Sequence, residues 1–167
     1  MSSNRSVKKP ADSTETRAKA ATQCFCNGYN CSQAVLTAFA GRYDLDEGLA
    51  MRLASGLGGG VGRMGEVCGT LTGAALVVGL ELGPKSSEDV DAKEKTYVAT
   101  RQLQERFIER HGSNICKELL QKDLSNRSEY LQAKELGLFK IHCPNYVETV
   151  VSLLDQLLED SEDQDER

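Results

Sequence analysis

The order of apolar and polar residues along the chain indicates helices throughout. The strict alternation of a half-buried strand is missing, and apolar residues recur three and four positions apart, as they do on one face of a helix. Between turn residues, this pattern predicts helices at 13–26, 44–56, 66–82, 87–110 and 128–136. It predicts three further helices that begin near residues 30, 113 and 143. We therefore expect an all-α protein, folded as a compact multi-helix bundle.

The segment 66–82 is apolar on every side, which is typical of a helix buried at the centre of a bundle. Gly65, Gly69 and Gly73 recur every fourth residue, so one face of this helix carries no side chains. A neighbouring helix can approach such a face closely. We expect residues 66–82 to form the central helix, with another helix packed along its glycine face.

Three flanking helices carry an apolar stripe that we expect to face the core. The stripe of the 44–56 helix consists of Leu45, Leu49, Leu53 and Leu57, with Met51 alongside. The stripe of the 87–110 helix consists of Ala92, Thr96, Ala99, Leu103 and Phe107. The final helix is expected to begin at Cys143-Pro144, because proline favours the first helical position, and to bury Val147, Val150, Val151, Leu154, Leu157 and Leu158.

Length and charge divide the chain into one domain and two polar ends. With 167 residues, of which 40 % are hydrophobic, the chain has room for a single core. We expect a disordered polar arm at 1–12, a helical domain at 13–158 and a disordered acidic tail at 159–167. The tail holds six acids and one base, so it accounts for the whole formal net charge of −5.

The same composition argues against several partners. The longest apolar run, residues 74–80, is far shorter than the roughly 20 residues that span a bilayer, and the first twenty residues lack the apolar stretch of a secretory signal. The basic residues near the N-terminus are few and have no aromatic residues among them, which disfavours nucleic-acid binding. We expect a cytoplasmic protein with no membrane partner and no nucleic-acid partner.

Four of the six cysteines fall at the N-terminus of an expected helix. The free N–H groups and the partial positive charge there stabilise a thiolate, which is the form that reacts or binds metal. We expect these four residues to converge on one site: Cys31, Cys68, Cys116 and Cys143. Cys24 and Cys26 are two residues apart on one helix, so they face different directions and stay outside that site.

Other motifs narrow the chemistry of this site. The chain has no Cys-x-x-Cys, which disfavours a zinc ribbon, a thioredoxin motif and covalently attached haem. Residues 60–65 match G-x-G-x-x-G, but they follow a helix and not a strand, so we expect no nucleotide. His111 and His142 lie near site cysteines in the sequence and could tune a thiolate or bind metal, and Glu66 is the nearby acid that could accept a proton.

Four separated segments resemble one protein family. They are Gly28-Tyr29-Asn30-Cys31-Ser32-Gln33-Ala34-Val35, the stretch from Gly58 to Gly73 around Cys68, Gly112-Ser113-Asn114-Ile115-Cys116, and Cys143. Over about residues 18–158 the chain resembles the C_GCAxxG_C_C family of redox proteins, which are small helical proteins similar to the N-terminal helical part of split-Soret cytochromes. The resemblance implies that Cys31, Cys68, Cys116 and Cys143 are the family cysteines, and the cytochrome relative is associated with an iron–sulfur centre.

The residues leave the occupant of the site open. In a redox or electron-transfer protein, the four thiolates hold an iron–sulfur cluster, most simply a two-iron cluster, or they form reversible disulfides with Cys31 and Cys68 as the reacting pair. Four thiolates suit a structural zinc ion equally well, in a helical interaction module without redox activity. A scaffold with inert thiols is the third function. A redox partner and a homodimer are both compatible with the sequence, and no substrate follows from it.

Overall fold

A computed structural model describes residues 13–165, with side chains up to residue 160, and shows the expected all-α fold. This part of the chain forms eight α-helices and, in place of strands, one isolated bridge between Val67 and Ile115. The α-helices are α1 (Thr14–Cys26), α2 (Cys31–Ala40), α3 (Glu47–Ala54), α4 (Gly69–Leu82), α5 (Val90–His111), α6 (Cys116–Leu120), α7 (Arg127–Glu135) and α8 (Leu138–Asp165). The 3-10 turns η1 (Gly41–Tyr43) and η2 (Ser55–Leu57) follow α2 and α3.

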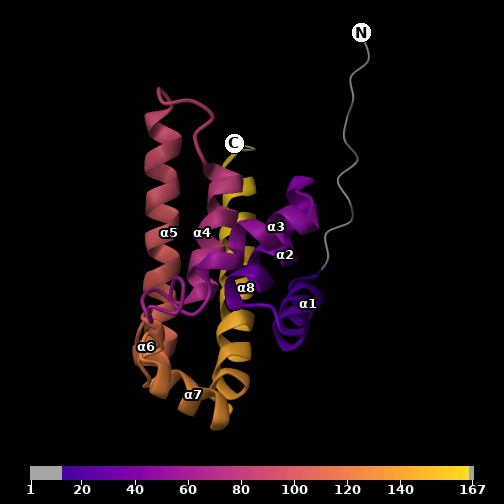
Figure 1. Cartoon of the computed structure of the whole chain (residues 1–167). Helices are drawn as coiled ribbons and strands as arrows, with labels where there is room; N and C mark the ends of the chain where they lie inside the picture. Colours follow the sequence, from indigo (N-terminus) through magenta and orange to yellow (C-terminus); the bar gives the residue numbers. More distant parts are fainter. Residues whose placement is uncertain (1–12, 166–167) are drawn as a thin grey trace.

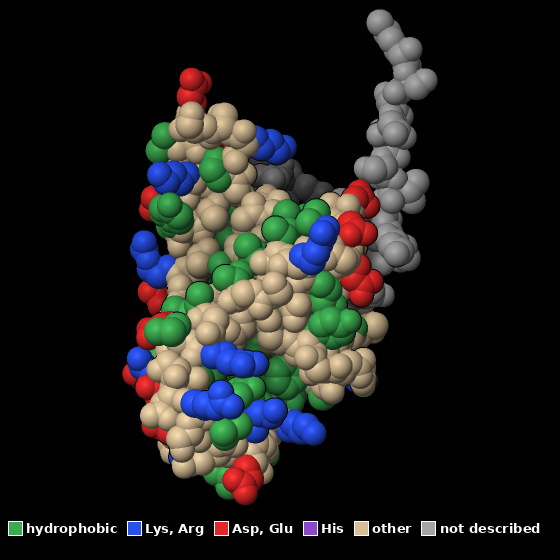
Figure 2. All heavy atoms as spheres, viewed as in Figure 1, with side chains coloured by type: hydrophobic (Ala, Val, Ile, Leu, Met, Phe, Trp, Pro, Cys, Tyr) green, Lys and Arg blue, Asp and Glu red, His purple; other side chains and the backbone are tan. Residues whose placement is uncertain are grey.

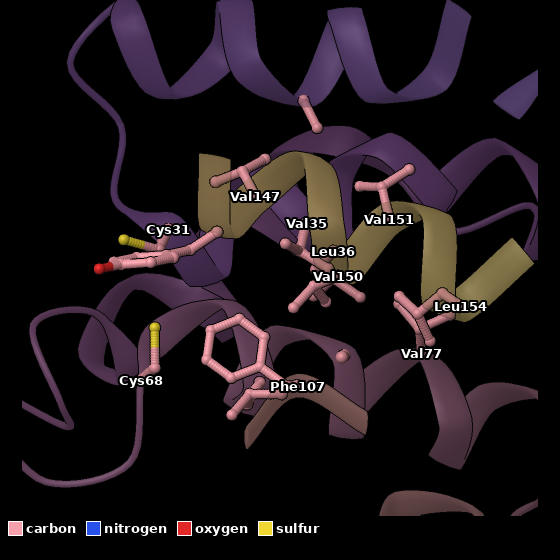
Figure 3. Packing of buried hydrophobic residues seen from close by; sticks show 14 of the residues in the cluster. Cys31, Val35, Leu36, Cys68, Val77, Phe107, Val147, Val150, Val151 and Leu154 are labelled. Carbon is pink, nitrogen blue, oxygen red and sulfur yellow. The ribbon is translucent and has the colours of Figure 1, made fainter. Parts of the chain in front are cut away.

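The core lies between α2, α4, α5 and α8 (Figure 1). α4 contacts α2, α5 and α8, which confirms its central place, and α1 packs against α2 and α8. The short helices α6 and α7 lie at one end of the bundle, beside the start of α8. Apolar side chains of four helices meet in this core (Figure 3), among them Val35, Leu36, Val77, Phe107, Val147, Val150, Val151 and Leu154.

The central helix begins three residues later than the sequence indicates. Residues 66–68 are not helical, because their main chain pairs with the segment around Ile115. α4 therefore begins at Gly69, and Cys68 is its N-cap residue. A tertiary contact between two distant segments thus overrides the local helical pattern at this point.

The glycine face of α4 is the surface on which α2 packs. A Cβ atom at Gly73 would lie 2.7 Å from the carbonyl oxygen of Ser32, and one at Gly69 would lie 3.2 Å from the Cβ of Cys31. These distances confirm the expected close approach for Gly69 and Gly73. Gly65 precedes the helix and has a left-handed backbone with a φ of 70°.

The apolar face expected for the third helix is wrong for Leu49 and Leu53, whereas Leu45 packs against the core as expected. α3 buries Ala50 and Ala54 completely, whereas Leu49 and Leu53 are 39 % and 55 % exposed. α3 packs against α2, and the side chain of Gln33 donates a hydrogen bond to an α3 carbonyl oxygen at 2.9 Å. Small side chains let the two helices approach this closely, so the alanines and not the leucines face α2.

The expected start of the final helix is also wrong. α8 begins at Leu138, so Pro144 lies within the helix and Cys143 is not at its N-terminus. Proline removes one main-chain hydrogen bond and crowds the preceding turn. Leu138 and Phe139 pack against the core, and their burial favours a helix that starts upstream of the proline. At its other end α8 runs to Asp165, so the acidic segment is helical as far as that residue.

The inner faces of the two long helices agree with the sequence pattern. α5 buries Ala99, Leu103 and Phe107, and α8 buries all the residues of its expected stripe except Leu157, which is half-buried. The expected arm at 1–12 lies outside the described residues. Among the helices that are described, none has the length and apolar character needed to cross a bilayer.

Candidate functional site

A capping box holds Cys31 at the N-terminus of α2. The Asn30 side-chain oxygen accepts a hydrogen bond from the Gln33 N–H at 2.9 Å, and the Gln33 side-chain oxygen accepts one from the Asn30 N–H at 3.0 Å. Asn30 also donates to the carbonyl oxygen of Ser55 at 2.9 Å, which anchors this end of α2 to η2. Cys31 thus occupies the first helical position, as expected, and is 9 % exposed.

The bridge between Val67 and Ile115 brings Cys68 and Cys116 together. The Cys68 N–H donates to the carbonyl of the residue before Ile115 at 2.8 Å, and the Cys116 N–H donates to the carbonyl of the residue before Val67 at 2.7 Å. Side chains alternate between the two sides of such an antiparallel pair, so both cysteines, each one position after a bridged residue, lie on the same side. Cys68 caps α4, Cys116 begins α6, and both are buried.

The glycine loop at 58–65 connects these two parts of the site. A Cβ atom at Gly58 would lie 2.5 Å from the Asn30 side chain, and one at Gly60 would lie 2.4 Å from the main-chain nitrogen of Glu66. Only glycine permits such contacts. The loop therefore packs the capped end of α2 against the bridged segment that carries the next two cysteines.

Cys143 comes from the interior of α8 and is buried beside Cys31. The two thiols are within hydrogen-bonding reach of each other. Figure 3 shows Cys31 and Cys68 next to each other at one edge of the core. The structure thus brings all four expected cysteines into one region, although only three of them lie at helix N-termini.

Burial and crowding keep the thiols of Cys31, Cys68 and Cys116 protonated. Burial, with a further contribution from Cys31, raises the pKa of Cys68 to about 12. Hydrogen bonding with Cys143, followed by burial, raises the pKa of Cys31 well above its ordinary value, and burial together with Cys68 and Cys31 raises the pKa of Cys116. The expectation that the helix N-termini make these groups thiolates is therefore wrong for the thiols on their own, because loss of hydration outweighs the helix dipole.

Hydrogen bonds at the N-terminus of α4 lower the pKa of Cys68, although burial raises it by more. The Cys68 sulfur lies 3.2 Å from the Thr70 hydroxyl, and main-chain hydrogen bonds from Thr70 and Leu71 lower the pKa of this thiol against the effect of burial. The site therefore contains donors that stabilise negative charge on sulfur once a bound cation compensates for the burial.

The four thiols interact as one group. Cys31 interacts with Cys143 and with Cys68, and Cys116 interacts with Cys68 and Cys31. Among the described residues, no three His, Cys, Asp or Glu side chains gather closely enough to hold a single metal ion. A two-iron cluster takes two thiolates on each iron, so this donor set suits it, whereas a single tetrahedral ion needs all four sulfurs around one point.

The other candidate groups are engaged elsewhere. His111 Nε2 lies 3.0 Å from the Thr149 hydroxyl, and the His142 side chain is exposed. The Glu66 carboxylate accepts a hydrogen bond from Lys117 Nζ at 3.1 Å on the surface. No hydrogen bond joins any of the three groups to a site thiol in the part of the chain that the structure describes.

Tyr146 is the site residue that sequence reasoning missed. Burial, followed by the thiols of Cys143, Cys68 and Cys116, raises the pKa of Tyr146, so its ring lies beside them. Its hydroxyl donates to the Leu119 carbonyl at 3.4 Å. A signal was available, because Tyr146 follows Cys143 by three residues and so shares its face of α8.

The fold and the site define a small helical protein built around a buried centre of four cysteines. The chain belongs to the family described as "Putative redox-active protein (C_GCAxxG_C_C)", whose family model matches residues 29–157. This match confirms the resemblance and includes the four site cysteines, whereas Cys24 and Cys26 of α1 precede the matched range. Comparison with curated proteins and with solved structures gave no match.

Proposed function

We propose that the chain is an electron-transfer protein whose four buried cysteines hold a two-iron iron–sulfur cluster. The observation that carries this proposal is the gathering of four buried thiols that interact with one another but do not converge tightly enough to hold a single metal ion: Cys31, Cys68, Cys116 and Cys143. Membership of a family described as redox-active supports the same conclusion. When bound, such a cluster supplies a carrier for one electron at a time.

The state of the thiols favours metal binding over thiol–disulfide exchange. Exchange proceeds through an accessible thiolate. The four thiols here are at most 9 % exposed, and the pKa values of Cys31, Cys68 and Cys116 are raised. Coordination to a metal cation deprotonates a thiol and compensates for the crowding of negative charge. A buried group of crowded thiols is therefore suited to a cationic centre and poorly suited to attack on a disulfide.

The surrounding residues would orient the ligands and tune the centre. The capping box fixes Cys31, and the bridge fixes Cys68 and Cys116 relative to each other. Donors from Thr70 stabilise charge on the Cys68 sulfur, and hydrogen bonds to cluster sulfurs are among the determinants of reduction potential. Tyr146, only 8 % exposed, helps to exclude water from the thiols.

Two alternatives involve the same residues. A reversible disulfide is one, and for it the pair in direct contact is Cys31 with Cys143 in place of the Cys31–Cys68 pair suggested by the sequence. A structural zinc ion in an interaction module is the other, and it would require the four sulfurs to close around a single point.

The test is anaerobic purification followed by iron and acid-labile sulfide analysis, absorption spectroscopy and electron paramagnetic resonance. We expect about two irons and two sulfides per chain, because that is the composition of the cluster. Replacement of any one site cysteine by serine should abolish this content: Cys31→Ser, Cys68→Ser, Cys116→Ser and Cys143→Ser. Cys24→Ser and Cys26→Ser are the matched controls and should retain it.

The other outcomes separate the alternatives. One zinc ion per chain, lost together with the fold on chelation, would establish the structural metal site. Metal-free protein that loses two free thiols on mild oxidation would establish the disulfide, and peptide mapping would identify the pair. Metal-free protein with an unchanged thiol count would refute both forms of redox function.

A further inference from the structure

Four cations lie on the surface formed by the glycine loop, α6 and α7. Arg63 stacks over the Tyr130 ring at 4.5 Å, and Lys134 reaches the same ring at 5.9 Å. Lys122 Nζ donates to the side chain of Gln132 of α7 at 3.1 Å. The side chain of Lys117 packs against Gly65 of the loop. We call the surface formed by Arg63, Lys117, Lys122 and Lys134, with the apolar residues Val61 and Met64, the basic surface.

Figure 2 shows Lys and Arg side chains gathered, with apolar side chains between them, toward the end of the molecule where α6 and α7 lie. Of the nearby acids, Glu66 pairs with Lys117 of the basic surface. Three other acids of this region bind neutral donors close to them: Glu118 binds Ser113, Asp123 binds Ser125, and Glu129 binds the Asp123 N–H. Arg63, Lys122 and Lys134 form no ion pair with a described residue, so their charges stay available to a partner in a chain whose net charge is −5.

The apolar residues of the basic surface are held in solvent by a strained loop. Val61 is 42 % and Met64 57 % exposed. Val61 and Arg63 have φ angles of 60° and 66°, a left-handed conformation that is unfavourable for a β-branched or long side chain. Main-chain hydrogen bonds lock the loop, including that from the Gly62 N–H to the Gly56 carbonyl at 2.9 Å. The fold thus holds these side chains in a fixed, exposed arrangement at a conformational cost.

The basic surface adjoins the segments that carry two of the site cysteines. The Lys117 N–H donates to the Gly65 carbonyl at 2.9 Å, and the next hydrogen bond of the same pairing, from the Cys116 N–H to the Glu66 carbonyl, is 2.7 Å long. The loop then continues through Glu66 to Cys68. A molecule bound to the basic surface would therefore contact the two segments that carry Cys68 and Cys116.

We infer that the basic surface is the docking site of a small acidic electron-transfer protein. This inference rests on the proposed function. A short-lived redox encounter needs only a small contact area, an apolar centre and charges that steer the partner into place. Val61 and Met64 provide the apolar centre, and the four cations provide attraction for an acidic rim.

The first test measures binding and does not depend on the occupant of the site. The full chain is titrated with an acidic plant-type ferredoxin as the probe, by calorimetry at low and high salt. We expect binding that weakens with salt and falls about tenfold in the double variant Arg63→Glu/Lys134→Glu. The control, Lys95→Glu/Arg101→Glu on exposed positions of α5, carries the same change in charge and should bind as the wild type does.

The second test measures electron release from the reduced protein to hexacyanoferrate(III), in which one electron leaves the centre and reduces iron(III) to iron(II) in the anion. A net charge of −5 alone predicts repulsion and a rate that rises with salt. Local attraction at the basic surface predicts the opposite, a rate that falls with salt. The Arg63→Glu/Lys134→Glu variant should reverse this dependence, and the α5 control should not.

The outcomes separate this inference from the proposed function. Metal-free protein that binds ferredoxin through the basic surface refutes the cluster and retains the docking site. Cluster-loaded protein whose rate rises with salt overturns the docking site alone. Absence of ferredoxin binding, equal weakening in both double variants, or tighter binding to a DNA oligonucleotide than to ferredoxin also overturns the inference.

Discussion

The packing of α2 against α4 at Gly73 offers a direct test of how the fold positions the cysteines. A Cβ atom at Gly73 would lie 2.7 Å from the Ser32 carbonyl oxygen and 3.0 Å from the Ser32 Cα. Both are main-chain atoms, so no side-chain rotation can relieve the overlap and α2 must move away. Because Cys31 precedes Ser32 and Cys68 caps α4, Gly73→Ala should also displace two of the four thiols from each other.

The expected loss of stability can be worked out from two opposing contributions. Overpacking of a core contact costs about 1–3 kcal/mol, and alanine returns up to about 1 kcal/mol of helical propensity. Gly73→Ala should therefore lower the free energy of unfolding by up to about 2 kcal/mol. Gly79 lies in the same helix and has nothing within 4 Å of an added Cβ, so Gly79→Ala should gain up to about 1 kcal/mol. Because both variants gain the same helical propensity, they should differ by the overpacking cost of about 1–3 kcal/mol, or roughly 2–12 °C in melting temperature.

Thermal and urea unfolding followed by circular dichroism measure this difference, and iron analysis of both variants as purified measures its effect on the site. Gly73→Ala should melt lower and hold less iron than Gly79→Ala. Equal stability of the two variants would refute the reasoning about the α2–α4 contact. Lower stability with full iron content would show that the contact supports the fold without positioning the cysteines.

Three further predictions concern backbone strain, protonation and charge burial. Val61→Gly should leave the free energy of unfolding unchanged or raise it by up to about 1 kcal/mol, because it relieves a left-handed backbone. The control Val98→Gly in α5 should lower it by about 0.5 kcal/mol, and the reverse order in urea unfolding would contradict this prediction. Burial lowers the pKa of His111, so the neutral form stabilises the fold above the unfolded pKa near 6.5, and this contribution is lost as the pH falls through the folded pKa. His111→Gln should therefore lose less melting temperature between pH 7 and pH 5 than the wild type, and an equal loss would count against the prediction. Asp155 is only 6 % exposed and binds Arg17 of α1. Asp155→Asn should therefore lower the free energy of unfolding by about 3 kcal/mol, and a change below about 1 kcal/mol would show that this charge is not effectively buried.

Features that depend on a few neighbouring residues were predictable from the sequence. Ser13 and Asn30 cap α1 and α2 where the pattern places the start of each helix, since a cap involves only residues of the first turn. The stripe of α5 is predictable for a similar reason, because a helix that lies along the core repeats its contacts every three to four residues. The glycine spacing in α4 likewise indicated the face on which α2 packs.

Features that depend on a distant partner were not predictable in this way. Leu49 and Leu53 form a convincing apolar stripe, yet the close packing of α3 on α2 selects Ala50 and Ala54. Pro144 is a strong signal for a helix start, yet burial of the preceding turn extends α8 upstream of it. In both places packing against the rest of the protein outweighs a local preference of about 1–3 kcal/mol.

The same division holds for the site. The sequence by itself determined which four of the six cysteines form a group, since each lies in a separate motif, and it determined the all-α fold. Only the tertiary structure decided how they meet, because the Val67–Ile115 bridge joins two segments that are far apart in the chain and α8 brings Cys143 to Cys31. It also decided the protonation of Cys31, Cys68 and Cys116, because the hydration that a thiolate loses depends on the whole surrounding core and not on the helix to which the cysteine belongs.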